Sequence, residues 1–511
     1  MLLVSALLMA AQVILGSLQP SQRSDFFVFW SAARYVAERP AHDVTGIYDP
    51  ATFKAFQRTL VLGEGDAPNP DPPAAVEPSF HPFAYPPHML LLLRPLAALD
   101  EHRAELAWLL AGFALLVAAV GAHRRPARLV ALAVAPAALI DVAYGQNGFW
   151  TAALLAGGLL RLADRPVLAG VAFGLLTIKP QLGLVVPVVL LGAGAWRALA
   201  AATLTTLALV SVTALLFGVE AWRAWFVQLH GFADTTILNL QHLSPHLASL
   251  PAALLQSGLS IDAARIVHLV VAVAVLAGLW TFARSRRRAS FIDSSKAGRL
   301  YPRGNDRAMA PNETLTVAAL LATPVVAPFA YVYDTMLIVP AILLLASVGA
   351  HRRRAEGRIV LLGLWLAPFL SIGLMPLGIP AVPLACAAAL IVFFVPMREC
   401  RGALASALRI ETPCQGRRDQ QHGGGRQRRQ EEAAGHVGED AGGDRPQDLS
   451  GAEGGGDQRH HLRRRSGPQG PGGGETERGD GDEGAAQQQT TQSEPDDRRR
   501  RHAGGHTRGL D

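Results

Sequence analysis

Long apolar runs recur along the chain up to about residue 400, and short arginine clusters separate many of them. A bilayer core of roughly 30 Å needs about 20 apolar residues per helix, and somewhat fewer where the flanking side chains snorkel. Half of the 511 residues are hydrophobic and only 17% are charged, which is too apolar for an ordinary soluble protein. The fold class predicted from this pattern is an all-α polytopic membrane protein.

About twelve transmembrane helices are predicted from these runs. Their approximate bounds are 1–18, 104–122, 128–143, 148–163, 167–178, 182–195, 198–217, 265–283, 314–330, 335–349, 359–374 and 379–396. The first run is alternatively a secretory signal peptide, but it has no basic leading region and no small-x-small cleavage site before Asp25. Because this run carries no flanking charge, the true start of the protein is expected upstream.

The arginine clusters fix the predicted orientation. If "HRRPAR" (123–128) lies in the cytoplasm, strict alternation puts the other basic clusters on the same side, as the positive-inside rule requires. This pattern of basic residues indicates membrane topology and not nucleic-acid binding. The opposite, extracytoplasmic side then receives a first loop at 19–103, a second loop at 218–264 and the short turns between the remaining spans.

The composition changes abruptly near Arg401. Residues 401–511 contain no aromatic residue and are rich in Gly, Arg, Gln, Asp and Glu, so they cannot bury enough apolar area to offset chain entropy. We expect a transmembrane domain at 1–400 and a disordered, low-complexity tail at 401–511. The tail is open to three interpretations: a solvated appendage, an Arg/Gly-rich segment that binds RNA or acidic lipid, or a reading-frame artefact.

Polar and ionisable side chains gather at the predicted outer helix ends. Ionisable groups at the edges of spans usually face a cavity or a partner, which suggests an outward-facing polar cavity. The residues are Asp25, Tyr48, Asp49, His81, Tyr85, His88, Asp141, Tyr144, Gln146, Asn147, Lys179, Gln181 and Asp334.

Among these residues Lys179 is the most specific indication of a functional role, since the chain has only two other lysines, Lys54 and Lys296. It lies between two apolar runs, and Pro180 directly after it breaks the helix. A lysine at such a discontinuous helix can neutralise a phosphate as a point charge. The alternative is a lysine that snorkels from a helix end.

The remaining candidates have structural alternatives as well. "LIDVAYGQNGFW" is also consistent with a polar turn, in which Gln146 and Asn147 only cap helix ends, and Asp334 with an N-cap of the following helix. Asp25 could likewise cap an interfacial helix at 26–36. The first loop contains two segments, "FFVFWSAARYV" (26–36) and the apolar later part of "FHPFAYPPHMLLLLRPLAALD" (80–100), that are predicted to be helices lying along the membrane surface.

No metal site is predicted from the histidines or cysteines. His81, His88, His230, His242 and His246 all fall in the two outer loops without HxxH or HExxH spacing, so each alone is interpreted as a surface residue. The three cysteines also lack metal-ligand spacing. No Walker loop or GxGxxG fingerprint is present, and no cofactor is expected.

Five segments together resemble glycosyltransferase family 87 in order and spacing. They are "SDFFVFWSAARYV", "GIYDPATF", "FAYPPHMLLLLRPLAAL", the stretch from "YGQNGFW" to "IKPQLGLVV", and "TPVVAPFAYVYDTMLIVP". The combination of "GQN" with "KPQ" some thirty residues later carries most of the resemblance, which covers about residues 1–397. The family groups polytopic transferases of the C superfamily, including mannosyl- and arabinofuranosyltransferases that use polyprenyl-phosphate sugars.

The resemblance implies an integral enzyme of the cell membrane with an extracytoplasmic active site. Its expected substrates are a polyprenyl-phosphate sugar, with mannose ahead of arabinofuranose, and a lipid or glycan acceptor. Asp25 matches the acidic residue that acts as general base on the acceptor hydroxyl in such inverting enzymes. The donor phosphate or substrate is then expected to contact Lys179, Gln181, Gln146, Asn147, Tyr85, His88, Tyr333 and Asp334.

Two other functions fit the same pattern of helices. A transporter or flippase of lipid-linked sugars would also use many helices, some of them broken, and intramembrane charges. The clustering of polar residues at one face, without an evident inverted repeat, favours the enzyme. A nonenzymatic assembly factor of the membrane is the third possibility, and it would not need Asp25 or Lys179.

Overall fold

The computed structural model describes residues 24–40, 42–62, 82–238, 244–293, 309–348 and 354–394. The chain divides into the units Met1–Pro413 and Cys414–Asp511, and every described residue belongs to the first. The predicted span 1–18, the tail at 401–511, and His81 and His242 lie outside the described residues. The boundary predicted at residue 400 therefore stays a prediction.

Within the described ranges every regular element is a helix, where η denotes a 3₁₀ helix. The first loop gives α2 (Phe26–Ala37), η1 (Thr45–Tyr48), α3 (Pro50–Leu62), α4 (Met89–Leu93) and η2 (Arg94–Ala98). The chain continues through α5 (Glu101–Val120), η3 (Ala122–Arg124), α6 (Pro126–Ala133), α7 (Pro136–Tyr144), α8 (Gly148–Arg161), α9 (Pro166–Leu175), η4 (Leu176–Ile178), η5 (Pro180–Gly183), α10 (Val185–Ala193) and α11 (Trp196–Phe217). It ends with α12 (Val219–Leu238), η6 (Ser244–His246), α14 (Leu250–Gln256), α15 (Ile261–Asp293), α16 (Pro311–Val326), η7 (Val332–Leu337), α17 (Ile338–Ala346), α19 (Ala355–Leu374), η8 (Met375–Leu377) and α20 (Ala381–Phe394).

Four of these helices are long and apolar enough to cross a membrane: α5, α11, α15 over Ile261–Arg286, and α19 with η8 over Ala355–Leu377. The pair α6 and α7, bent by 50°, would make a fifth. These helices fit a membrane protein, but the twelve predicted spans are not confirmed. The other apolar runs form shorter helices, such as α8 with 14 residues, which at about 1.5 Å per residue falls short of a bilayer core.

Basic clusters come together as two pairs at neighbouring helix ends: "HRRPAR" (123–128) with "RLADRP" (161–166), and "WR" (196–197) with the start of the cluster at 284–307. The guanidinium of Arg161, at the end of α8, donates to two carbonyls in the last turn of α5 at 2.8 and 3.2 Å. Asn312, at the start of α16, donates to the carbonyl of Leu160 at 2.7 Å. A Cβ added to Gly192 of α10 would lie 2.9 Å from Ala283 of α15. The opposite helix ends carry the predicted polar residues.

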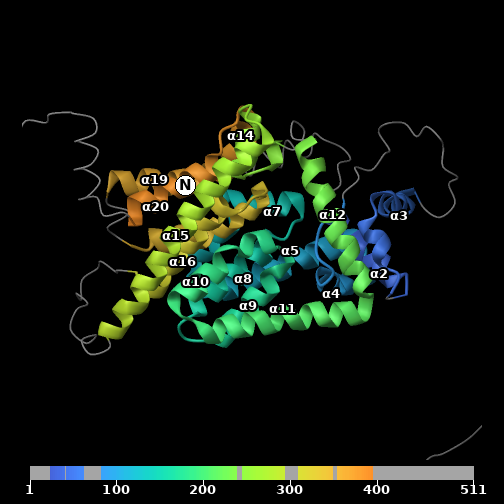
Figure 1. Cartoon of the computed structure of the whole chain (residues 1–511), viewed down its shortest axis with the longest axis horizontal. Helices are drawn as coiled ribbons and strands as arrows, with labels where there is room; N and C mark the ends of the chain where they lie inside the picture. Colours follow the sequence, from blue (N-terminus) through green and yellow to red (C-terminus); the bar gives the residue numbers. More distant parts are fainter. Residues whose placement is uncertain are drawn as a thin grey trace, which may run out of the picture. The chain divides into compact units, whose positions relative to one another are not determined.

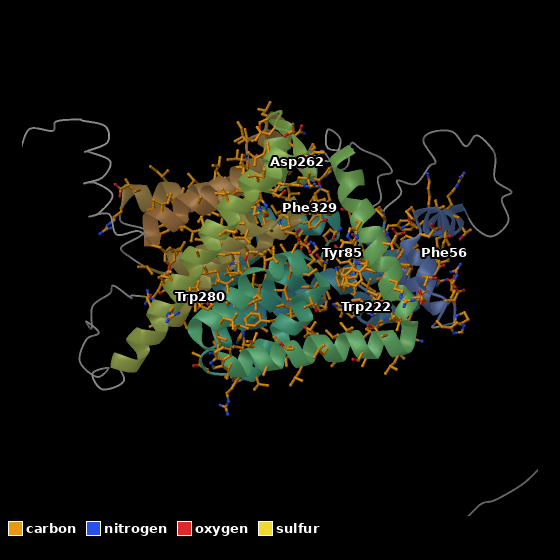
Figure 2. All side chains as sticks on the ribbon, in the orientation of Figure 1. Phe56, Tyr85, Trp222, Asp262, Trp280 and Phe329 are labelled. Atoms are coloured by element: carbon orange, nitrogen blue, oxygen red, sulfur yellow. The ribbon has the colours of Figure 1, made fainter. Side chains whose placement is uncertain are left out.

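Two large apolar clusters hold the unit together. The larger cluster contains residues of the helices from α5 through α10 and of α15, α16, α17, α19 and α20. Figure 1 shows α15, α16, α19 and α20 gathered on one side of the molecule. The second joins the first-loop helices to Trp108 of α5, Phe217 of α11 and α12. Tyr85 and Trp222, labelled in Figure 2, pack against this second cluster.

The second cluster encloses α2. Nine of its twelve residues are buried, including Phe26, Phe27 and Phe29, and the ring of Phe29 lies 5.5 Å from that of Trp108. An amphipathic helix on a membrane surface buries one face in lipid, whereas α2 is covered largely by protein. The structure therefore fixes the segment around Asp25 against α5, and the interfacial placement of these helices stays a prediction.

Candidate active site

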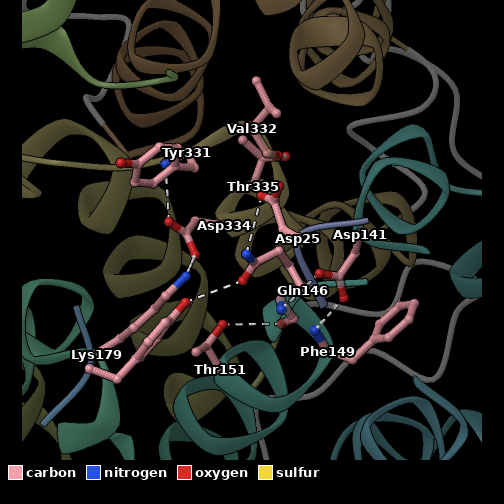
Figure 3. A network of polar contacts seen from close by, with 12 residues as sticks. Asp25, Asp141, Gln146, Phe149, Thr151, Lys179, Tyr331, Val332, Asp334 and Thr335 are labelled. Atoms are coloured by element: carbon pink, nitrogen blue, oxygen red, sulfur yellow. Dashed lines mark hydrogen bonds and ion pairs between the residues drawn. The ribbon is translucent and has the colours of Figure 1, made fainter. Parts of the chain in front are cut away.

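Asp25 precedes α2 at the position of its N-cap, but its carboxylate makes no capping hydrogen bond. The half-buried side chain instead receives a hydrogen bond from the amide nitrogen of Gln146, with Nε2 and Oδ2 separated by 3.3 Å (Figure 3). The structure thus brings the first loop to the "GQN" segment, which lies 121 residues further along the chain. The alternative in which the Asp25 carboxylate caps the helix is therefore wrong.

Gln146 is held by three groups that fix how its amide points. Its Oε1 accepts the hydroxyl of Tyr85 at 3.2 Å, and its backbone carbonyl accepts the indole N–H of Trp108 at 3.1 Å. Because the amide oxygen is occupied by Tyr85, the amide N–H₂ faces Asp25. Burial raises the pKa of Tyr85 well above its usual value, against the opposing effect of the nearby Asn147 side chain. Tyr85 therefore stays a neutral donor.

Lys179 forms a buried ion pair with Asp334. Nζ and Oδ1 lie 2.6 Å apart, and the two side chains are only 4% and 2% exposed. The second carboxylate oxygen of Asp334 accepts the backbone N–H of Tyr331 at 3.0 Å. The ammonium also lies 4.6 Å from the ring centroid of Tyr333 and 5.8 Å from that of Tyr85. Lys179 is thus neither snorkelling nor an unpaired cation.

The discontinuous helix predicted around Lys179 is present. Helix α9 tightens into η4, Lys179 adopts a non-helical conformation (φ −131°, ψ 78°), and Pro180 starts η5. The break turns the lysine side chain toward the pair of tyrosines. Gln181, in η5, is half-buried, and no hydrogen bond among the described residues joins it to the other candidates. The structure therefore does not bring Gln181 into the site.

Asp141 is a structural cap and not an open carboxylate. It is fully buried, and its two oxygens accept the backbone N–H groups of Gly148 and Phe149 at 2.8 Å each, at the start of α8. Gly145 allows the chain to reverse between α7 and α8, with φ +63°. Gln146 and Asn147 do not cap helix ends with their side chains. The turn predicted for this segment is thus real, but Asp141 makes the cap.

Sequence reasoning missed His246. Its Nδ1 lies 2.7 Å from the hydroxyl of Tyr144, and the imidazole is half-buried. The Tyr144 ring lies 5.9 Å from that of Tyr333, which stacks on Tyr331 at 5.2 Å. An isolated bridge pairs Leu247 with Tyr331 and holds η6 in place. The surface position expected for His246 is wrong, and no spacing in the sequence signals this tertiary contact.

His88 is a neutral, buried imidazole. Thr177 donates its hydroxyl to the carbonyl of Gly174 at 2.5 Å, so it must accept the Nε2–H of His88 at 3.2 Å. The ring stacks on Trp222 with 5.8 Å between centroids, and burial lowers the pKa of His88 to about 4. His88 approaches the segment that carries Lys179, but as a hydrogen-bonding group and not as a cation.

Hydrogen bonds thus join Asp25, Gln146 and Tyr85, and the ring of Tyr85 lies beside the ammonium of Lys179, which pairs with Asp334. Residues 83–301 match the family model of glycosyltransferase family 87. The match confirms the resemblance for the two motif segments that lie within it, "FAYPPHMLLLLRPLAAL" and the stretch from "YGQNGFW" to "IKPQLGLVV", and this similarity suggests a glycosyltransferase with a sugar donor and an acceptor as substrates. Neither a curated protein nor a solved structure matches the chain.

The region matched to glycosyltransferase family 87 contributes Tyr85, Gln146 and Lys179 to these contacts, while Asp25 and Asp334 come from outside it. Within the described ranges, no three His, Cys, Asp or Glu side chains lie close enough together to hold a metal ion. What the contacts from Asp25 to Asp334 offer to a glycosyl transfer is therefore an oriented carboxylate, a buried cation beside aromatic rings, and several neutral hydrogen-bonding groups.

Proposed function

We propose that the protein transfers a sugar from a polyprenyl-phosphate donor to a hydroxyl of a lipid or glycan acceptor, with inversion, on the extracytoplasmic face of the cell membrane. Mannose is the first candidate for the sugar and arabinofuranose the second. The observation that carries the proposal is the connection of Asp25, through Gln146 and Tyr85, to the buried cation Lys179. A base and a phosphate-binding group would thus share one site.

In the proposed reaction Asp25 accepts the proton of the acceptor hydroxyl while the hydroxyl oxygen attacks the anomeric carbon of the donor. The bond from that carbon to the phosphate oxygen breaks, and polyprenyl phosphate leaves with the bonding electron pair. Attack from the face opposite the phosphate inverts the anomeric carbon. The amide of Gln146 keeps the carboxylate oriented toward the hydroxyl.

The Lys179–Asp334 ion pair restricts how a phosphate can bind to the ammonium of Lys179. A buried pair is electrically neutral, so an incoming phosphate must share the ammonium with Asp334 or take its place. Lys179 has three N–H donors, and Asp334 is the hydrogen-bond partner found for one of them. The remaining donors are the ones we assign to the phosphate, with Tyr85 and Tyr333 at its flanks.

An apolar cavity supports a lipid-linked donor. Its volume is about 390 Å³, and it lies between α9, α10 and α11, the last of which is a candidate span. Thr177 and Pro180, on either side of Lys179 in the chain, belong to its lining. Lys179 itself does not line the cavity, so an isoprenoid chain bound there would place its phosphate beside the segment that carries the lysine. We further propose that the shorter apolar helices lie within the bilayer as broken spans.

The proposal is tested with the purified protein in lipid nanodiscs, given a panel of radiolabelled polyprenyl-phosphate sugars and a membrane extract as acceptor. Transfer from one of these donors, without any nucleotide sugar, is the expected result. Transfer that requires a nucleotide sugar would refute the donor class. Movement of the lipid-linked sugar across the bilayer without any new glycosidic bond would instead favour a transporter or flippase.

A further inference from the structure

Tyr144 and His246 form a hydrogen-bonded pair beside the proposed base. The tyrosine hydroxyl and imidazole Nδ1 are 2.7 Å apart, and the two rings meet edge to face at 88°. Tyr144 ends α7, whereas His246 belongs to η6, 102 residues later. A contact between two distant loops at this place is not needed to cap either helix, so it requires another explanation.

The turn after Tyr144 packs directly on the residues that flank Asp25. A Cβ added to Gly145 would lie 2.6 Å from the Cβ of Phe26 and 3.1 Å from the hydroxyl of Ser24. The next residue, Gln146, hydrogen-bonds to Asp25. Tyr144 therefore lies close to the carboxylate. Burial lowers the pKa of His246 below its usual value, and the charge of Asp25 partly opposes this lowering.

A general base must return its proton before the next turnover. After transfer, Asp25 is a neutral carboxylic acid, and its proton needs an acceptor nearby. The other carboxylates around it are already engaged. Asp334 pairs with Lys179, Asp141 accepts two backbone N–H groups, and Glu105 accepts the hydroxyl of Ser24 at 2.6 Å.

The surroundings of His246 contain no competing base among the described residues. Apart from Asp25, the titratable groups near His246 are Tyr144 at the end of α7, Tyr331 directly before η7, and Tyr333 and the paired Asp334 within η7. Helix α19 meets this segment through Ser371, whose hydroxyl donates to the carbonyl of Leu247, and η8 has no titratable residue. The imidazole is half-buried, so it retains access to water.

We propose that His246, acting through Tyr144, takes up the proton that Asp25 has removed from the acceptor. The proton of the Asp25 carboxyl passes to the oxygen of Tyr144 while the hydroxyl proton of Tyr144 passes to Nδ1 of His246. Asp25 is again a carboxylate, Tyr144 is again neutral, and His246 becomes an imidazolium that loses its Nε2 proton to water. Exchange with water then moves the remaining proton from Nδ1 to Nε2, which restores the tautomer whose Nδ1 accepts from Tyr144. This inference rests on the proposed function, because it needs Asp25 as the base.

The test compares single-turnover and steady-state transfer by His246→Gln and Tyr144→Phe. In a single turnover with enzyme in excess, both variants should transfer sugar within about threefold of the wild-type rate, because Asp25 starts as a carboxylate. In the steady state, kcat should fall by about tenfold or more, since loss of a positioned proton acceptor typically costs that much. The control is His230→Gln, because His230 is exposed and, among the described residues, its imidazole is hydrogen-bonded to the carbonyl of Phe226 in α12.

A second readout separates a proton acceptor from a structural contact. Added imidazole should restore much of the steady-state rate of His246→Ala, whereas it should leave His230→Gln unchanged. An unchanged kcat in the variants, an equal loss in single-turnover and steady-state rates, or a rise in KM alone would overturn the inference. Failure of the wild type to use any polyprenyl-phosphate sugar would instead refute the proposed function, so the two failures are distinguishable.

Discussion

Nζ of Lys179 lies 2.6 Å from Oδ1 of Asp334, and both side chains are almost completely buried. Removing one partner of a buried pair leaves an uncompensated charge in a medium of low dielectric, which typically costs about 3–5 kcal/mol. The single variant Lys179→Met should therefore destabilise the protein by about that amount. The double variant Lys179→Met/Asp334→Asn should recover most of the loss.

The same two variants separate stability from donor binding. Both lack the ammonium, so both should lose affinity for a polyprenyl-phosphate sugar. Only the single variant should unfold at a clearly lower temperature than the wild type. Thermal unfolding in detergent and donor binding by calorimetry measure the two effects. Lys54→Met is the matched control, because Lys54 is exposed in α3. Full donor affinity in the folded double variant would refute the phosphate role of Lys179.

Tyr85 is expected to act on Asp25 through Gln146. Tyr85→Phe keeps the ring near Lys179 and Phe29 but releases the amide oxygen of Gln146, so the amide is free to turn away from the carboxylate. Since one hydrogen bond contributes about 1 kcal/mol, kcat should fall roughly fivefold with little change in donor affinity. Gln146→Leu should lower kcat further. Equal loss of donor affinity and kcat would indicate a binding role.

Asp141 should matter for folding and not for chemistry. Asp141→Asn keeps the volume but offers one acceptor oxygen in place of two, which leaves one buried N–H of α8 without its partner. The expected cost in the free energy of unfolding is about 1–3 kcal/mol. Denaturation measurements on the wild type and the variant test this value. The kcat of the folded fraction should remain that of the wild type.

His88 predicts a pH dependence of stability. Its pKa is about 4 in the folded protein against 6.5 for an unperturbed histidine, so between these pH values the unfolded chain binds a proton that the folded chain does not. Stability due to this group is complete above about pH 6.5 and declines as the pH falls toward 4. At pH 5 the loss is about 2 kcal/mol.

His88→Phe removes this titration and can still stack on Trp222. The difference in melting temperature between pH 7.5 and pH 5 should therefore be smaller in the variant than in the wild type. Comparing this difference between the two proteins cancels the other groups that titrate in this range, because both proteins contain them. An identical pH dependence in the two proteins would contradict a neutral, buried His88.

The sequence predicted the local features of the site well. Pro180 after Lys179 identified the broken helix, because proline lacks the N–H of a helix interior. The arginine clusters predicted a common side, and the hydrogen bonds from Arg161 to the last turn of α5 bring two of those clusters to neighbouring helix ends. Both signals are local in the chain, so they can be interpreted without knowledge of tertiary contacts.

The partners of the site residues could not be predicted in the same way. Lys179 and Asp334 are 155 residues apart, and Tyr144 and His246 are 102 apart, with no periodic pattern to connect them. Asp141 looked like an outer carboxylate because its acceptor role depends on N–H groups after the turn at Gly145. The twelve predicted spans are not confirmed by the four or five candidates among the described residues, because apolar composition does not report where a helix breaks.

The most direct measurement is sugar transfer by Asp25→Asn alongside its affinity for the polyprenyl-phosphate donor. Asp49→Asn is the matched control, because Asp49 is an exposed acid of the same loop that bonds to Thr52. We predict that Asp25→Asn binds the donor as the wild type does and transfers no sugar above background, while Asp49→Asn remains active. Undiminished transfer by Asp25→Asn would contradict the role of Asp25 as the general base.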